Sequence, residues 1–245
     1  MTKELQQFEP SLPEVQDRLQ YRFRSIGLLI EALTHASYRA ETNSVFNDNQ
    51  RLEFLGDAVI QIIVTDKIYQ KYPSHPEGKL TKIRAAITRQ PRLAQLAKEL
   101  ELGKFLRLGH GERMNKGHER DSILCDAFES LIGAVFLDSG SRLDAAAVIL
   151  NRLVDKAHPE IENLLLDENP KGAFQEWSQK RFQEKPVYEV LNVNGPDHEK
   201  IYTIGVTIGE TRYGTGTAGK RQTAEQNAAR VAMESIISDG LADGT

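Results

Sequence analysis

The chain has 245 residues, of which 40% are apolar, and it carries 31 Lys and Arg against 35 Asp and Glu for a net charge of -4; this is typical of a globular chain of one to three domains and excludes disorder throughout. The acidic balance excludes a protein that coats nucleic acid through its overall positive field, so any binding of a polyanion must be local. No stretch approaches the roughly 20 apolar residues of a membrane span and the N-terminus lacks an apolar signal core, so we expect a cytoplasmic protein with no membrane partner.

Residues from about 12 to 157 have helical periodicity, because apolar residues recur every three or four positions. The clearest helices are expected over residues 49–72, 79–88, 91–100, 120–138 and 141–157. Pro73 and Pro76 would end the first of these, Pro91 suits a first helical turn, and Gly140 follows the fourth as a C-cap would. The sequence therefore predicts an all-α domain over residues 12–157.

Residues 158–167 carry a proline and an acidic bias just before the periodicity changes, so we place a linker there. Beyond it we expect a helix over 170–181, strands over 187–193, 200–208 and 212–216, and a final helix over 223–237. The apolar stripe of that last helix comprises Ala224, Ala228, Val231, Ala232 and Ile236. The order α-β-β-β-α predicts a small α+β domain over residues 168–238, which makes the chain multidomain.

Glu53 and Asp57 form the first of two acidic pairs. They are four residues apart in the helix expected over 49–72, so both carboxylates lie on one face. The neighbouring stripe of this helix is apolar and comprises Leu52, Leu55, Val59 and Ile62. Two like charges at the edge of a buried surface repel each other, and they are costly unless a positive group lies between them.

Asp126 and Glu129 form the second pair, at a spacing of three within core-like surroundings. Two such helices that faced each other would offer four carboxylates to one hard divalent cation, for which Mg²⁺ is the natural candidate. Acidic residues at helical spacing are also commonly a solvated face or partners of Lys and Arg, and spacing alone leaves that alternative open. Gly56 favours the metal-site interpretation. A glycine inside a helix costs about 1 kcal/mol relative to alanine, so its presence here suggests close approach of another backbone or a ligand.

Three segments resemble the ribonuclease III family, in the same order along the chain. They are Ala-Leu-Thr-His-Ala-Ser-Tyr at 32–38, Asn-Gln-Arg-Leu-Glu-Phe-Leu-Gly-Asp-Ala-Val at 49–59, and the segment at 121–138 that begins Asp-Ser-Ile-Leu-Cys-Asp-Ala-Phe-Glu. The resemblance implies that Glu53, Asp57, Asp126 and Glu129 are the family's metal-binding positions, with Asp57 and Glu129 catalytic. It implies an Mg²⁺-dependent endoribonuclease that cleaves double-stranded RNA, with Mn²⁺ as a possible substitute.

The same resemblance implies a homodimer whose two sites cut both strands. The products would carry 5′-phosphate and 3′-hydroxyl ends with short 3′ overhangs, in the processing of ribosomal and other structured RNA precursors. Phe54 resembles an aromatic knob that inserts into the partner subunit, although the sequence equally allows a core residue of the monomer. Glu77 matches an acidic position near the dimer interface. Gln50 departs from the family, which commonly has Glu there in an ancillary acidic pair with the position of Glu77.

Residues 168–238 resemble a double-stranded-RNA-binding domain. Lys220 and Arg221 precede the final helix, whose N-terminal amides and dipole also attract phosphate. By the resemblance Gln175 and Glu176, and the turn that contains His198, fall on the two regions that contact the RNA minor groove. Such domains read the shape of the duplex over about 16 base pairs, with little dependence on sequence.

Binding by this domain must rest on local clustering, because acidic residues outnumber basic ones over 168–245. The short basic run of Lys220 and Arg221 predicts few phosphate contacts and modest salt dependence. Without the surrounding pattern, both would be interpreted as a solvated helix start. Trp177 and Tyr188 are expected in the core, since duplex RNA does not expose its base faces.

The histidines and the single cysteine give no further prediction of a metal or redox site. The histidines show no metal-ligand spacing, and the single Cys125 rules out an internal disulfide and is expected to be a small buried hydrophobe. The main rival function is a non-catalytic RNA-binding or ribosome-associated protein on the same fold, which would gain nothing from four acids near a polyanion. A metal-dependent phosphatase would leave residues 168–238 without a purpose.

Overall fold

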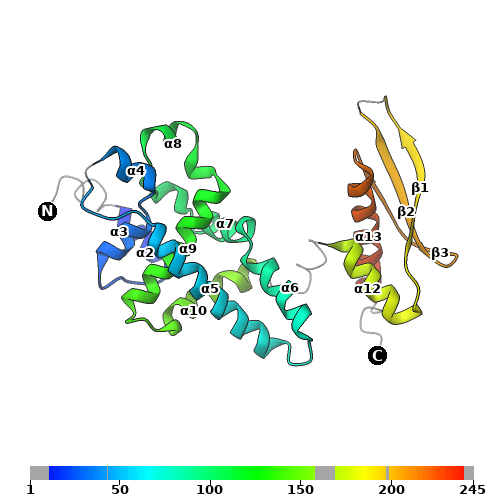
Figure 1. Cartoon of the computed structure of the whole chain (residues 1–245), viewed down its shortest axis with the longest axis horizontal. Helices are drawn as coiled ribbons and strands as arrows, with labels where there is room; N and C mark the ends of the chain where they lie inside the picture. Colours follow the sequence, from blue (N-terminus) through cyan, green and yellow to red (C-terminus); the bar gives the residue numbers. More distant parts are fainter. Residues whose placement is uncertain (1–10, 43, 158–168, 197–198, 240–245) are drawn as a thin grey trace. The chain divides into compact units, whose positions relative to one another are not determined.

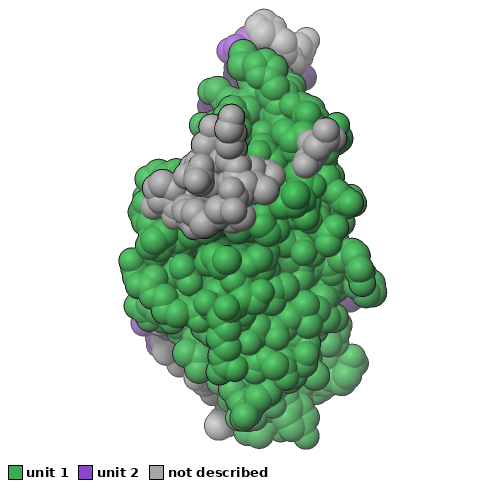
Figure 2. Space-filling view, turned by 90° about the vertical axis from the view of Figure 1, so that its left-hand side faces the viewer, with its two compact units in different colours: residues 1–160 green, residues 161–245 purple. Residues whose placement is uncertain are grey.

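The computed structural model describes residues 11–42, 44–157, 169–196 and 199–239, and the chain divides into two units, residues 1–160 and 161–245. Figure 2 shows them in green and purple. The linker expected over 158–167 lies outside the described residues. None of the described helices is long and apolar enough to cross a membrane.

The first unit is built of helices, as expected (Figure 1). Its α-helices are α2 (Leu12–Leu19), α3 (Ile26–Ala32), α4 (Ala36–Glu41), α5 (Gln50–Lys71), α6 (Glu77–Thr88), α7 (Gln90–Glu99), α8 (His110–Met114), α9 (Asp121–Asp138) and α10 (Leu143–Ala157), with 3-10 turns η2 (Leu102–Phe105) and η3 (Gly117–Glu119). The five long helices lie within two residues of their expected ends. The short ones between 12 and 48 and between 102 and 119 were not resolved individually by periodicity, because each is only one or two turns long.

The helix ends follow the expected stop signals. Gly140 takes a left-handed φ of +82° after α9, its N–H donates to the carbonyl of Leu137, and the N–H of Ser141 donates to that of Phe136. This is the Schellman arrangement, which satisfies the last carbonyls of a helix. Pro76, in an extended conformation, is the N-cap of α6, so this helix begins at Glu77, two residues earlier than expected.

Helix α9 lies at the centre of the first unit and is buried along most of its length. Helix α5 packs directly against it (Figure 1). The stripe expected on α5 is correct for Leu52 and Val59, which are buried, but wrong for Ile62, whose side chain is 52% exposed. Acidic residues on the inner helices therefore stand close to a desolvated core.

The second unit has the predicted α-β-β-β-α order. It consists of α12 (Pro170–Phe182), β1 (Val187–Asn194), β2 (Ile201–Ile208), β3 (Thr211–Ala218) and α13 (Arg221–Ser238). The strands form one antiparallel sheet in the order β1-β2-β3, and both helices lie on the same face of it (Figure 1). Its core comprises Phe174, Val206, Ile208, Ala228, Ala229, Ala232 and Ile236, with Trp177 and Tyr188 packed against it as expected.

Two expectations for α13 are wrong. Val231 is exposed and Ala229 is buried in its place, because the helix turns a slightly different face to the sheet. The helix also begins at Arg221 and not at Thr223, since Lys220 takes the extended conformation of an N-cap. Arg221 therefore belongs to the first turn of the helix and does not precede it.

Candidate active site

Helices α5 and α9 each carry one of the two acidic pairs. Glu53 and Asp57 lie one turn apart on α5, and Asp126 and Glu129 lie one turn apart on α9. Glu53, Asp126 and Glu129 are half-buried, whereas Asp57 is exposed. The Gln61 amide donates to Asp57 at 3.4 Å and to the hydroxyl of Thr88 at 3.2 Å, which orients the exposed carboxylate.

Two glycines set the distance between these helices. A Cβ atom placed on Gly56 would lie 1.8 Å from the carbonyl oxygen of Glu129, and one on Gly133 would lie 2.4 Å from that of Leu52. Such distances are far below van der Waals contact, so the two backbones touch where the helices cross. Gly56 lies between Glu53 and Asp57, which places both acidic pairs at this crossing. The sequence pointed to Gly56 but missed Gly133.

A chain of hydrogen bonds fixes the start of α5 against α9. The carbonyl of Asn49 accepts from the N–H of Glu53 at 2.9 Å and from the Ser130 hydroxyl at 3.0 Å. The N–H of Asn49 in turn donates to the carbonyl of Thr34 at 2.8 Å. The turn that carries Glu53 is therefore held to the helix that carries Asp126 and Glu129.

The electrostatics show that the pairs interact across the crossing. Burial, followed by the charge of Asp57 on the other helix, raises the pKa of Glu129 to about 7. Burial likewise raises the pKa of Glu53, with Asp126 and then Asp57 adding to it. Both pKa values rise, as expected for carboxylates that lie near one another in a poorly hydrated environment. The carboxylates of the two helices are therefore close enough to influence one another across the crossing.

His35 is a neighbour of this site that sequence reasoning missed. Burial raises the pKa of Asp126, and the charge of His35 opposes that rise. The imidazole lies at the N-cap of α4, where its Nδ1 accepts from the N–H of Ser37 at 3.2 Å. Its nearness to Asp126 depends on the packing of segments about 90 residues apart, so no spacing rule could have found it.

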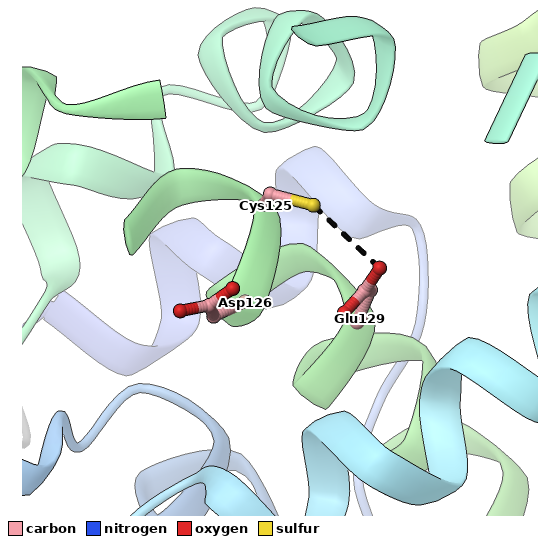
Figure 3. A group of neighbouring side chains, drawn as sticks. All are labelled: Cys125, Asp126 and Glu129. Carbon is pink, nitrogen blue, oxygen red and sulfur yellow. Dashed lines mark hydrogen bonds between the residues drawn. The ribbon is translucent and has the colours of Figure 1, made fainter. Parts of the chain in front are cut away.

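Cys125 also belongs to the site. Its Sγ donates to Oε1 of Glu129 at 3.5 Å (Figure 3). The thiol is only 5% exposed, as expected of a small buried hydrophobe, and burial raises its pKa. The ligand atoms of Cys125, Asp126 and Glu129 lie within 4.8 Å of one another. The spacing of four between Cys125 and Glu129 on one helix was the sequence signal for this contact.

The residues present fit a divalent cation. Among the described residues, none of the four carboxylates forms an ion pair with lysine or arginine, so no such cation offsets their mutual repulsion. Carboxylate oxygens are also the donors that hard divalent cations prefer. Asp126 and Glu129 form the tight part of the group, and Glu53 and Asp57 face it from α5. The interpretation of these acids as an ordinary solvated face does not fit the partial burial of Glu53, Asp126 and Glu129.

The two residues predicted at a dimer interface both lie on the surface. Phe54 is 83% exposed, so its alternative interpretation as a core residue is wrong. Glu77 is exposed at the start of α6, where its carboxylate accepts from the Thr81 hydroxyl at 2.9 Å. Gln50 is exposed at the first turn of α5.

The residues predicted to bind RNA lie in two parts of the second unit. Gln175 and Glu176 are exposed on α12, and Lys220 and Arg221 are exposed at the start of α13. Arg221 is not simply solvated, because its Nε donates to Glu225 at 3.1 Å. His198 lies outside the described residues. The sequence analysis missed the bond between Arg221 and Glu225, although a spacing of four between opposite charges in a helix was a signal for an ion pair.

Comparisons with known proteins divide the chain in the same way. Residues 25–157 match the family model described as ribonuclease-III-like, and residues 170–236 match that of the double-stranded RNA binding motif. A protein of Wolinella succinogenes named Ribonuclease 3 is 38% identical over 224 residues, 91% of each chain. Another of that name, from Streptomyces coelicolor, is 44% identical over 222 residues, 91% of this chain and 79% of that protein.

A solved structure resembles the first unit. The nuclease domain of ribonuclease III from Campylobacter jejuni, whose description mentions a flexible region involved in dimer formation, superposes with a TM-score of 0.55 at 39% identity. The match covers 60% of this chain and 97% of that one.

Proposed function

The chain belongs to the ribonuclease III family, and from that premise we propose that it is an endoribonuclease that hydrolyses double-stranded RNA. The observation that carries the proposal is the approach of two acidic pairs at the crossing of α5 and α9, where no carboxylate of either pair forms an ion pair with lysine or arginine among the described residues. We assign residues 12–157 to the endonuclease domain, 158–167 to a linker and 168–238 to the RNA-binding domain. A bacterial protein with RNA as its substrate would act in the cytoplasm.

Glu53, Asp57, Asp126 and Glu129 would hold the divalent cation, for which we propose Mg²⁺ with Mn²⁺ as a substitute. Such a cation lowers the pKa of a coordinated water and stabilises the charge that develops on the phosphodiester. No Ser, Cys or His nucleophile is needed for hydrolysis of this kind. The buried thiol of Cys125, with its raised pKa, is unsuited to act as one.

The protein's own contribution is to hold the acids in place before substrate arrives. The glycine contact fixes α5 against α9, Ser130 and Asn49 fix the turn that carries Glu53, and Gln61 orients Asp57. Asp57 and Glu129 are the proposed catalytic pair. The raised pKa of Glu129 means that its carboxyl has to release a proton near neutral pH before it serves as a ligand.

The second unit would supply substrate recognition. Exposed Gln175 and Glu176 on α12, together with His198, would contact the minor groove of the duplex. Lys220 and Arg221 would contact phosphates at the start of α13, where the helix dipole adds to their charge. A surface of this kind reads the A-form shape of RNA and not its sequence.

We further propose that the active enzyme is a homodimer. The highly exposed Phe54, one residue from Glu53, would insert into the partner subunit, and Glu77 would lie near the same interface. Two sites would then cut both strands, leaving 5′-phosphate and 3′-hydroxyl ends with short 3′ overhangs. Substrates of this class include ribosomal and other structured RNA precursors.

The proposal is tested by incubating the full chain with long duplex RNA, with and without Mg²⁺, and analysing the ends of the products. We expect Mg²⁺-dependent cleavage of the duplex, with 5′-phosphates and short 3′ overhangs, and no cleavage of single-stranded RNA. Duplex binding without cleavage in either Mg²⁺ or Mn²⁺ would instead support the non-catalytic rival. Cleavage of single strands at an equal rate would contradict the proposed substrate.

A further inference from the structure

Glu225 joins two cations that come from different helices of the second unit. Its Oε2 accepts from Nζ of Lys171 on α12 at 2.6 Å, and its Oε1 accepts from Nε of Arg221 on α13 at 3.1 Å. We call these three residues the Glu225 trio. The carboxylate is largely buried, with its side chain 14% exposed, whereas that of Arg221 is 61% exposed. Glu225 therefore lies beneath Arg221 and anchors it from the protein side.

The anchoring leaves the outer part of the guanidinium available. Only the Nε of Arg221 is bonded, and its two terminal NH₂ groups have no partner among the described residues. A guanidinium is a planar fork, so fixing Nε also fixes the direction of the terminal donors. Arg221 is also the first residue of α13, and the amides of a first helical turn have no carbonyl partner within the helix.

Lys171 has no comparable freedom. Its Nζ binds Glu225 and lies 4.4 Å from the centroid of the Tyr188 ring, while its N–H donates to the Gln226 side chain at 3.2 Å. The hydrogen bond from Lys171 is the largest influence that holds the pKa of Glu225 below its ordinary value, and Arg221 contributes as well. Lys171 thus offsets the negative charge of Glu225, and the trio as a whole keeps a net charge of about +1 at neutral pH.

We propose that Glu225 is a positioning residue for duplex RNA: it holds Arg221 with its terminal NH₂ groups aimed outward at a phosphate, and Lys171 supplies the charge that keeps this place positive. The inference rests on the proposed function, because it assumes that the start of α13 meets RNA. According to this inference, the acidic Glu225 strengthens the binding of RNA. An argument from net charge alone predicts that an acidic residue weakens it.

Glu225→Ala distinguishes these two arguments. Binding of a fluorescent RNA duplex by the full chain is measured by anisotropy in EDTA at several salt concentrations, so that cleavage does not interfere. Loss of one phosphate contact takes about 0.9 from the salt slope, which corresponds to roughly eightfold weaker binding near 0.1 M salt. We expect Glu225→Ala to show this lower slope and this weaker binding, although the substitution makes the protein less acidic.

The matched control is Glu234→Ala, which removes the same charge from an exposed position on the same helix. We expect it to bind as tightly as the unmodified chain or slightly more tightly. Glu225→Gln should fall between Glu225→Ala and the control, because one neutral acceptor remains for Arg221 but holds it less strongly than a carboxylate. Lys171→Met should also weaken binding, since the Glu225 and Arg221 charges would then cancel.

The fluorescence of Trp177, the single tryptophan of the chain, reports whether the second unit of each variant is folded. If Glu225→Ala does not fold, the comparison of Glu225→Gln with Glu234→Gln decides. Binding by the Glu225 variants that equals or exceeds that of the Glu234 controls would overturn the inference while leaving the proposed function intact. An unmodified chain that does not bind duplex RNA at all would instead overturn the proposed function.

Discussion

Replacing Gly56 by alanine tests whether contact between α5 and α9 holds the two acidic pairs together. The new Cβ would lie 1.8 Å from the carbonyl oxygen of Glu129, whereas ordinary van der Waals contact begins at 3.4 Å. The obstacle is backbone, so the helices have to separate by about 1.6 Å. Overpacking of this kind costs about 3 kcal/mol. Since alanine is favoured over glycine in a helix by about 1 kcal/mol, we expect a net loss of about 2 kcal/mol.

The same separation moves Glu53 and Asp57 away from Asp126 and Glu129. A misplacement of about 1 Å at a reacting centre can cost about 100-fold in rate, so we expect cleavage to fall by at least that factor. Stability is measured by denaturant unfolding of the full chain, followed by far-UV circular dichroism for the helices of the first unit. Trp177 fluorescence follows the second unit and should not change.

Gly78→Ala is the matched control, because nothing lies within 4 Å of the position that its Cβ would take in α6. We expect this variant to be as stable and as active as the unmodified chain, or slightly more stable. If Gly56→Ala behaved like Gly78→Ala in both measurements, the crossing would not determine the geometry of the acidic pairs, and the reasoning would be refuted.

Three further changes test other parts of the structure. Asp138→Asn should lower the free energy of unfolding by about 1–3 kcal/mol at pH 7, because the carboxylate accepts from the Tyr21 hydroxyl and from the backbone of Arg24 and Ser25. Burial opposes the shift, but these bonds lower the pKa of Asp138 in the folded protein. The stabilisation by its carboxylate is therefore complete above the ordinary carboxyl pKa of about 4 and is lost as the pH falls through the lower folded pKa. A stability difference between the variant and the unmodified chain that grows toward low pH in urea unfolding would contradict this. Phe54→Ala should leave monomer stability within about 0.5 kcal/mol but weaken self-association in sedimentation, and unchanged association would remove Phe54 from the interface. Lys220→Ala combined with Arg221→Ala should lower the salt slope of duplex binding by about 2, and an equal slope would show that neither residue meets phosphate.

The sequence predicted the long helices and the strands well, because their periodicity is strong and proline or glycine marks their ends. Helix α9 is an example, since Gly140 identified its C-terminus to the residue. The short helices before Asn49 were missed because one or two turns contain too few apolar repeats to define a period. Ile62 was assigned to the buried stripe because spacing alone does not distinguish an apolar face in the core from an exposed one.

For the candidate site, spacing along each helix identified the acids but not their environment. Glu53 and Asp57 could be placed on one face from the sequence, yet only the fold shows that Asp57 raises the pKa of Glu129 on another helix. The contact of Gly133 with Leu52 and the approach of His35 to Asp126 are equally tertiary. Arg221 was found as a cation, whereas its anchor across two helices depends on how α12 meets α13.

The most direct test of the central claim is to measure cleavage and duplex binding side by side for Glu129→Gln. The substitution keeps the shape of the side chain and removes the negative charge that the proposed reaction requires. We expect cleavage in Mg²⁺ to be abolished while the affinity for duplex RNA, which depends on the second unit, stays the same. Cleavage that persists, or that falls only in proportion to a loss of binding, would contradict the assignment of these carboxylates as the catalytic centre.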